Sequence, residues 1–126
     1  MSIQISTSLD NLALGCSTTQ ADLTWALQRN PLPSGSQPRF VRIDNINNST
    51  GVFVSITPTT ETITVAGSST TGNCFFIAPN SSVTVELITQ GGSVATSAFN
   101  DGSGNCVISG ITLDSTAIIL VTPVGE

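Results

Sequence analysis

The chain has 126 residues and a net charge of −5 at pH 7, with 39% hydrophobic and only 9% charged residues. This length suits one domain with one core, large enough to fold without disulfides or metal. Three arginines and no lysine cannot form the clustered basic face that nucleic-acid binding requires, so we expect no nucleic-acid partner. No segment approaches the roughly 18 apolar residues that span a bilayer, and the N-terminus lacks the pattern of a signal peptide. We therefore expect that the chain is made in the cytoplasm and that it does not associate with membranes.

The first clear strand pattern places apolar residues at alternate positions, which is typical of β-structure. Its apolar face consists of Leu23, Trp25 and Leu27. We expect Trp25 to lie in the core, with an interface or sugar-stacking role as the alternative. Residues 30–38 contain three prolines and a glycine, which predict a loop because proline removes a hydrogen-bond donor from a sheet.

Two further strands are predicted at residues 40–44 and 52–56. The turn-rich segment between them indicates that they form a β-hairpin. The apolar run at residues 74–77 predicts a strand covered on both faces, and Pro123 is expected to end the last strand. The later strands are predicted at residues 62–65, 74–77, 83–87, 106–111 and 117–121.

About eight or nine short strands separated by turns, with no convincing helix, predict an all-β protein. The interleaving of strands and turns favours an antiparallel β-sandwich of the jelly-roll or Greek-key type.

The residues that usually perform catalysis are scarce. Histidine, tyrosine and lysine are absent, which removes three common choices for acid–base chemistry and leaves any serine nucleophile without a base. The eight carboxylates occur singly along the chain, and a pair assembled by folding, as in glycosidases, is the alternative. We therefore expect no enzyme activity, no catalytic residues and no cofactor.

The cysteines Cys16, Cys74 and Cys106 are odd in number and widely spaced. Without histidine they cannot build the usual zinc sites, so we expect no bound metal. Buried free thiols are the favoured interpretation, and a disulfide between two of them is the alternative. Residues 101–105 alternate oxygen-bearing side chains as a calcium loop does, but the distal glutamate is missing, which favours a glycine-rich turn.

From residue 40 onward, an ordered set of motifs resembles the small β-proteins encoded beside the capsid genes of many tailed bacteriophages. Val-Arg-Ile-Asp-Asn is followed by Val-Phe-Val, by a Pro-Asn-Ser-Ser-Val turn, and by a tail that ends in Val-Thr-Pro-Val-Gly-Glu. These motifs lie at residues 41–45, 52–54, 79–83 and 121–126, the tail motif beginning at Ile111. Residues 57–73 form a longer Thr- and Ser-rich insertion than the pattern contains.

The resemblance implies a structural virion protein, in particular a capsid cement or decoration protein on the exterior of the phage head. It also implies a jelly-roll fold and a homotrimer that stabilises the shell of major capsid protein. The low charge fits this role, because burying serine and threonine costs less than burying lysine or glutamate. A host- or glycan-binding module of a tail or fibre is the alternative.

Two features are candidates for contact with other chains. We expect residues 1–15 to form an N-terminal strand or arm that reaches a neighbour, and residues 16–126 to form a single β-sandwich domain. Two arginines, one just before and one within the strand predicted at residues 40–44, are candidate partners in interfacial ion pairs, with a solvated strand face as the alternative. The candidate interface residues are Ile3, Ile5, Leu9, Leu12, Arg39 and Arg42.

Overall fold

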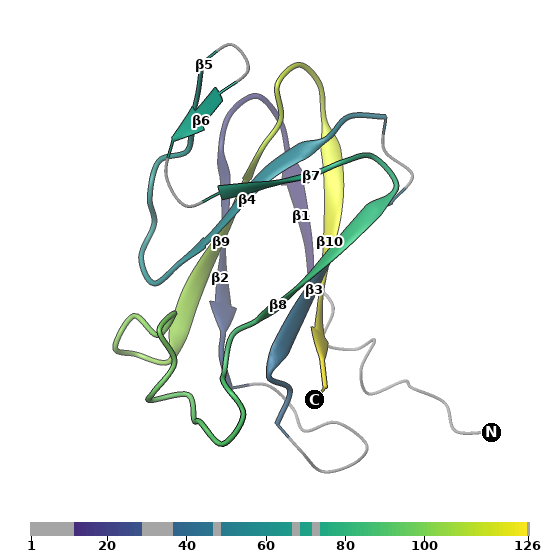
Figure 1. The fold of residues 1–126 in the computed structure, drawn as a ribbon. Helices are drawn as coiled ribbons and strands as arrows, with labels where there is room; N and C mark the ends of the chain where they lie inside the picture. Colours follow the sequence, from purple (N-terminus) through teal and green to yellow (C-terminus); the bar gives the residue numbers. More distant parts are fainter. Residues whose placement is uncertain (1–11, 29–36, 47–48, 67–68, 72–73, 126) are drawn as a thin grey trace, which may run out of the picture.

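The computed structural model describes residues 12–28, 37–46, 49–66, 69–71 and 74–125, and none of these residues is helical. Two four-stranded antiparallel sheets pack face to face, with a two-stranded sheet at one end (Figure 1). Across sheet A the order is β1 (Leu12–Cys16), β10 (Ala117–Val124), β3 (Phe40–Asn45) and β8 (Ser81–Glu86). Across sheet B it is β2 (Ala21–Ala26), β9 (Asn105–Ile111), β4 (Val52–Thr57) and β7 (Cys74–Ile77). The small sheet pairs β5 (Thr64–Ala66) with β6 (Ser69–Thr71).

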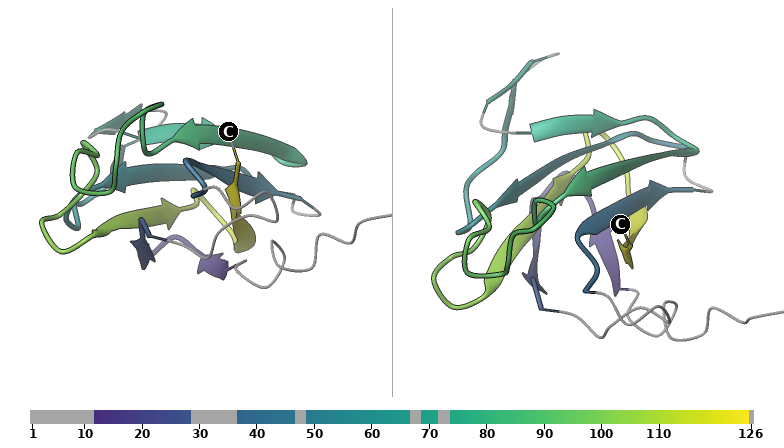
Figure 2. Two further views of the ribbon diagram at one scale, coloured as in Figure 1. Left: turned by 90° about the horizontal axis from the view of Figure 1, so that it is seen from below. Right: turned by 60° about the horizontal axis from the view of Figure 1, so that its bottom comes forward.

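The strand pairing is nested. β1 pairs with β10, β2 with β9, β3 with β8 and β4 with β7, so the first half of the chain runs antiparallel to the second. Figure 2 shows β1 and β2, in purple, along one edge of the sandwich and the green β7 and β8 along the other. The predicted all-β antiparallel sandwich is confirmed, and the nesting favours its jelly-roll type.

The predicted hairpin between the third and fourth strands is wrong. β3 pairs with β10 and β8 in sheet A, whereas β4 pairs with β9 and β7 in sheet B. The turn-rich segment between them therefore crosses from one sheet to the other. Alternating apolar residues indicate which face of a strand is buried, but they do not identify the strand beside it.

The core lies between the two sheets, and each sheet contributes the inward-facing half of its residues. Trp25 is buried there, as predicted, and so are Cys16 and Cys106. None of the three cysteines forms a disulfide, and Cys74 is only partly buried. The thiols of Cys16 and Cys106 thus act as small apolar side chains, which agrees with the favoured interpretation.

Two predictions were wrong: that the strand at residues 74–77 is covered on both faces, and that Pro123 ends the last strand. β7 is covered on one face only: Ile77 is buried, but Phe76 is 52% exposed because β7 forms the edge of sheet B. β10 does not end before Pro123, which continues the pairing with β3 opposite Val41. β1 pairs only with residues 117–121, so Pro123 lies beyond the described part of that neighbour, where a missing N–H donor is tolerated.

The segment resembling a calcium loop is a turn held by hydrogen bonds from its own backbone N–H groups to the side chain of Asp101. Asp101 Oδ1 accepts the N–H groups of Ser103 at 2.7 Å and Asn105 at 3.2 Å. Gly102 and Gly104 adopt φ values of 100° and 90°, which only glycine adopts without strain. No group of three potential metal ligands occurs among the described residues. Within the same part of the chain, no helix could cross a membrane.

Candidate interaction surface

The outer face of sheet A exposes large apolar side chains on a central strand. On β10, Ile118 is 64% exposed and Leu120 is 38% exposed. Their cross-strand neighbours on β1 are small, with Gly15 opposite Ile118 and Ala13 opposite Leu120. A side chain added at Gly15 would meet no atom within 4 Å. Ile118 and Leu120 therefore project beyond their small neighbours on β1. We call these two residues, together with Gly15 and Ala13, the apolar ridge.

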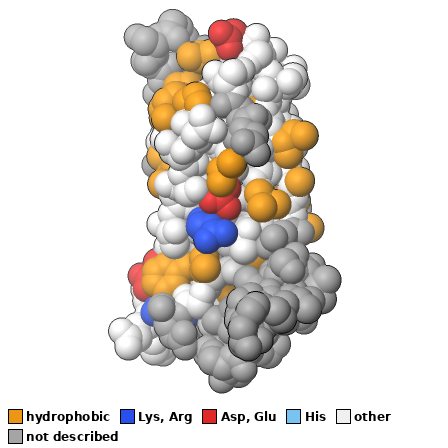
Figure 3. All heavy atoms as spheres, turned by 90° about the vertical axis from the view of Figure 1, so that its right-hand side faces the viewer, with side chains coloured by type: hydrophobic (Ala, Val, Ile, Leu, Met, Phe, Trp, Pro, Cys, Tyr) orange, Lys and Arg blue, Asp and Glu red, His pale blue; other side chains and the backbone are white. Residues whose placement is uncertain are grey.

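An ion pair lies next to the apolar ridge on β3. Arg42 Nε donates to Asp44 Oδ2 at 3.2 Å, and the hydroxyl of Ser82 on β8 donates to the other carboxylate oxygen. The Arg42 side chain is 46% exposed, whereas the Asp44 side chain is buried. Leu120 is the cross-strand neighbour of Asp44, so the ridge and the ion pair lie side by side on the sheet. Figure 3 shows this face, with a basic group beside an acidic one near its centre and hydrophobic groups to the right.

The described residues on the outer face of sheet A carry no net charge, although the chain does. Arg39 Nη1 binds Glu86 Oε2 at 2.8 Å, so both described arginines are paired with carboxylates of β3 or β8. The remaining described carboxylates lie on sheet B or in segments outside sheet A. They are Asp22, Glu61, Asp101 and Asp114. Two copies of the chain, or this chain and another acidic surface, can therefore approach at sheet A without repulsion between like charges.

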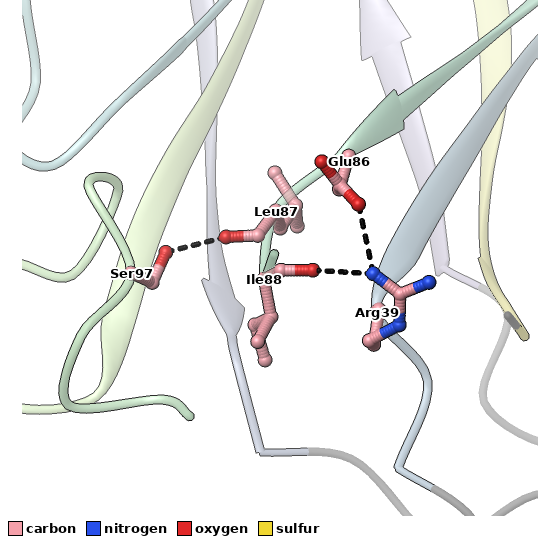
Figure 4. A network of polar contacts seen from close by, with 5 residues as sticks. All are labelled: Arg39, Glu86, Leu87, Ile88 and Ser97. Carbon is pink, nitrogen blue, oxygen red and sulfur yellow. Dashed lines mark hydrogen bonds and ion pairs between the residues drawn. The ribbon is translucent and has the colours of Figure 1, made fainter. Parts of the chain in front are cut away.

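Arg39 is engaged within its own chain (Figure 4). Besides Glu86, its Nη1 donates to the carbonyl oxygen of Ile88 at 3.0 Å, and the backbone N–H of Leu87 donates to the Arg39 carbonyl at 2.8 Å. Ser97 Oγ donates to the Leu87 carbonyl at 2.6 Å. The Arg39 side chain is only 17% exposed. It fastens the segment after β8 to the start of β3, whereas Arg42 is the arginine available on the open face.

Two hollows lie near these residues. One of about 400 Å³ lies beside Arg39, and its described lining is Gln28, Gln37, Arg39, Ile88, Gly92, Ser93 and Val94. One of about 280 Å³ lies on sheet A, lined by Phe40, Thr84, Val124 and Gly125. Neither described lining contains a carboxylate or a thiol, so neither hollow brings together an acid–base pair or a set of metal ligands.

The predicted arm only partly falls within the described chain. Ile3, Ile5 and Leu9 lie outside the described residues. Leu12 is 36% exposed at the start of β1, and residues 12–15 pair with β10 of the same chain. The prediction of an arm therefore concerns residues 1–11.

Sequence reasoning missed the apolar ridge. The sequence predicts a strand at residues 117–121, but because every residue in the run is apolar, the pattern alone does not separate buried from exposed side chains. A signal was available: alternate residues of a strand face opposite sides, so with Ile119 and Val121 in the core, Ile118 and Leu120 must face outward. Only a covering layer could then hide them, and the sequence does not show whether one exists.

The outer face of sheet B is arranged differently, because much of it is buried. Gln20 Oε1 accepts the N–H of Ile63 at 2.7 Å, and Gln20 Nε2 donates to the Glu61 carbonyl at 2.7 Å. The segment after β4 thus runs along the outer side of sheet B toward β5 (Figure 1). Three outward-facing residues of β4 and β9 are buried there. They are Ser55, Thr57 and Ser109.

Sheet B also carries an exposed aromatic ring, at its edge strand β7. Phe76 on β7 faces Phe53 on β4, with ring centroids 4.9 Å apart and planes tilted by 50°. A Cβ placed at Gly51 would come within 2.1 Å of the Phe76 ring, so the ring lies against bare backbone. The absence of a side chain at Gly51 is what admits this position of the ring.

No family model, no curated protein and no solved structure matches this chain. The resemblance to phage proteins therefore rests on the ordered motifs alone. What the protein does must be argued from its surface.

Proposed function

We propose that this chain is a structural, non-catalytic capsid decoration protein that binds the outer surface of a phage head through the outer face of sheet A. Its partners are the major capsid protein and further copies of itself, and its fold is a jelly roll. The observation that carries the proposal is the outer face of sheet A, where the exposed apolar side chains of Ile118 and Leu120 lie beside an internally neutralised ion pair. The ordered motifs that resemble phage virion proteins support the biological setting.

The physical reasons concern the cost of burying this face. The apolar ridge gains free energy when it leaves water, at roughly 25 cal/mol per Å² of apolar area. Around the ridge, the partly buried pair of Arg42 and Asp44 already satisfies its own charges. A ligand that binds only the assembled shell stabilises that shell by mass action. Many copies of a small protein with such a face would therefore reinforce a capsid without any chemical reaction.

The resemblance implies a trimer, and a closed ring of identical subunits needs two different contact surfaces on each. Residues 1–11 are a candidate for one of these surfaces, as an arm that adds to a neighbour. Deleting residues 2–11 keeps β1 in the chain and should weaken trimer formation or shell attachment. A truncated protein that assembles and binds shells normally would remove the arm from the proposal.

The direct test is binding to assembled shells that lack this protein. Purified wild-type protein should co-sediment with shells and saturate at many copies per particle, counted by mass spectrometry. The double variant Ile118→Ser, Leu120→Ser should lose most of this binding. Leu113→Ser is the matched control, because Leu113 is 50% exposed in the turn between β9 and β10. Equal binding by the double variant and the wild type would contradict the proposal.

A second candidate function is supported by Phe76. A half-exposed ring beside Phe53 offers an apolar surface on which a sugar ring or another flat group can stack. This favours a host- or glycan-binding module of a tail or fibre. Selective binding on a glycan array that Phe76→Ala abolishes would establish it, and an array without signal would exclude it for the glycans displayed.

A further inference from the structure

One edge of sheet A is a strand that lacks a second neighbour among the described strands. β8 is the last strand of the sheet, and among the described residues it pairs only with β3. Its register with β3 is continuous from Ser81 to Glu86, with no bulge, and it contains no proline or lysine. Natural sheets commonly protect their edges with these features. β8 is therefore a strand to which another strand can be added.

The hydrogen-bonding direction of each β8 residue follows from its pairing. Leu87 donates its N–H to Arg39, which continues the β3–β8 register and marks a hydrogen-bonded pair. Because such pairs alternate in an antiparallel ladder, the backbone groups of Val85, Val83 and Ser81 also face β3. The N–H and C=O groups of the residues between them point away from the sheet. These residues are Ser82, Thr84 and Glu86.

This edge is complementary to itself. If two β8 strands run antiparallel with Thr84 opposite Thr84, then Ser82 lies opposite Glu86 of the other copy, and the outward backbone groups of all three residues are paired. Threonine pairs are favourable across strands, and no like charges meet, because Glu86 faces a hydroxyl. A shift by two residues in either direction, with Val83 or Val85 at the centre, would leave the outward groups of Glu86 or of Ser82 without a partner within β8. The sequence thus selects one register.

The same register buries apolar surface that is now partly exposed. Val83 and Val85 face the core but are only partly buried, because no strand covers their free side. In the paired arrangement, Val83 of one copy lies opposite Val85 of the other. The two edges of sheet B are less suitable: β7 has four residues, and Gln20, just before β2, already holds the segment that follows β4.

We propose that two copies of this chain pair antiparallel through β8, about a two-fold axis at Thr84, so that their A sheets form one continuous sheet. The contact is isologous and closes with two copies. It lies at the opposite end of sheet A from β1 and β10, so it does not compete with binding through the apolar ridge. The proposal is independent of the virion assignment.

Sedimentation equilibrium of the isolated protein tests the pairing. The contact is small, so the measurement should span roughly 10 µM to 1 mM, where weak dimers dissociate. Thr84→Pro removes the central outward N–H, costs no hydrogen bond to β3, and should raise the dimer dissociation constant at least about tenfold. Thr84→Ala, which keeps the amide, is the matched control and should shift it far less. Equal association by all three proteins would overturn the proposal.

Charge exchange at the same position gives an independent readout. Thr84→Lys and Thr84→Glu each place like charges opposite one another across the axis and should weaken pairing several-fold. An equimolar mixture places opposite charges together and should restore pairing, which a misfolded variant could not do. Thermal melting should first show that both variants are folded. If the equimolar mixture of folded variants then does not return to the mass of the dimer, the two-fold register is contradicted.

Amide hydrogen exchange of the wild type needs no variant at all. At low concentration the N–H groups of Val83 and Val85 should exchange slowly, and those of Ser82, Thr84 and Glu86 quickly. At high concentration all five should be slow. Protection that does not depend on concentration at the three outward amides would overturn the proposal, whereas loss of shell binding by the Ile118 and Leu120 variant alone would leave it intact.

Discussion

The two outer faces of the sandwich differ in what covers them. On sheet B, the outward residues Ser55 and Ser109 are buried, and Gln20 holds the segment after β4 against the same side of the molecule. On sheet A, Ile118 and Leu120 remain exposed at the middle of the sheet. The two outer faces thus differ in where large apolar side chains reach solvent: at the middle of sheet A, where the outward-facing Asp44 and Thr122 are nevertheless buried, but at the edge strand of sheet B, where Phe76 is exposed.

The difference indicates where the chain relies on itself and where it relies on another molecule. A sheet face that a chain covers with its own residues contributes to the stability of the monomer. Large apolar side chains that remain in water add no burial free energy to the monomer, and they gain this free energy only when a partner covers them. Substitutions on the two faces should therefore affect different measurements.

The largest effects are expected in the core that the two sheets share. Ile43 of sheet A and Ile108 of sheet B are both fully buried. Ile43→Ala and Ile108→Ala should each lower the free energy of unfolding by about 2–5 kcal/mol, from lost burial and the cavity left behind. Urea denaturation measures this. A loss below about 1 kcal/mol at either site would show that this sheet does not pack against the common core.

The next largest effect is expected where sheet B is covered. Gln20→Ala removes the hydrogen bonds to Glu61 and Ile63 and should cost about 1–3 kcal/mol, because it leaves backbone groups of this segment unpaired. The control is Gln28→Ala, an exposed glutamine in the same part of the chain, which should change stability by less than about 0.5 kcal/mol. Equal effects of the two variants would mean that Gln20 does not hold the segment.

A pH effect of similar or smaller size should come from the buried thiols of both sheets. Burial raises the pKa of Cys16 from 9.0 to about 11, and burial together with the nearby charge of Asp101 raises that of Cys106 to about 12. The folded state disfavours the thiolate, so this stability is complete below pH 9 and is lost as pH rises through 11 and 12. At pH 10 unfolding should be favoured by about 1 kcal/mol for each thiol.

Denaturation midpoints at pH 8 and pH 10 measure this change. The double variant Cys16→Ala, Cys106→Ala should show a smaller difference between the two pH values than the wild type. At pH 8 a thiol reagent should modify Cys74 first, because Cys74 is only partly buried. Rapid labelling of all three thiols in the folded protein would contradict the burial of Cys16 and Cys106.

The smallest effect on stability is expected on the open face. Ile118→Ser should change the free energy of unfolding by no more than about 1 kcal/mol, since the side chain is already exposed. Ile119→Ser, one residue further along the same strand, should cost several times more because it places a hydroxyl in the core. Similar losses at both positions would show that Ile118 contributes to the core of the monomer.

The sequence was sufficient to place most strands and their buried faces, because alternation directly reports burial. Trp25 is the clearest example. It was not sufficient to pair them: β3 and β4 are neighbours in sequence but lie in opposite sheets, and the pairing depends on contacts between distant segments. It also could not distinguish an exposed outer face from a covered one. Ile118 and Phe76 both occur in apolar runs that look buried until the edges and coverings of the sheets are known.

The central claim is that sheet A, and not sheet B, meets the partner. Hydroxyl-radical footprinting of the protein, free and bound to assembled shells, tests it by comparing oxidation at Ile118 and Leu120 with oxidation at Phe76. We expect binding to reduce oxidation strongly at Ile118 and Leu120 and to leave the oxidation of Phe76 unchanged. Protection of Phe76 with undiminished oxidation of Ile118 and Leu120 would contradict it.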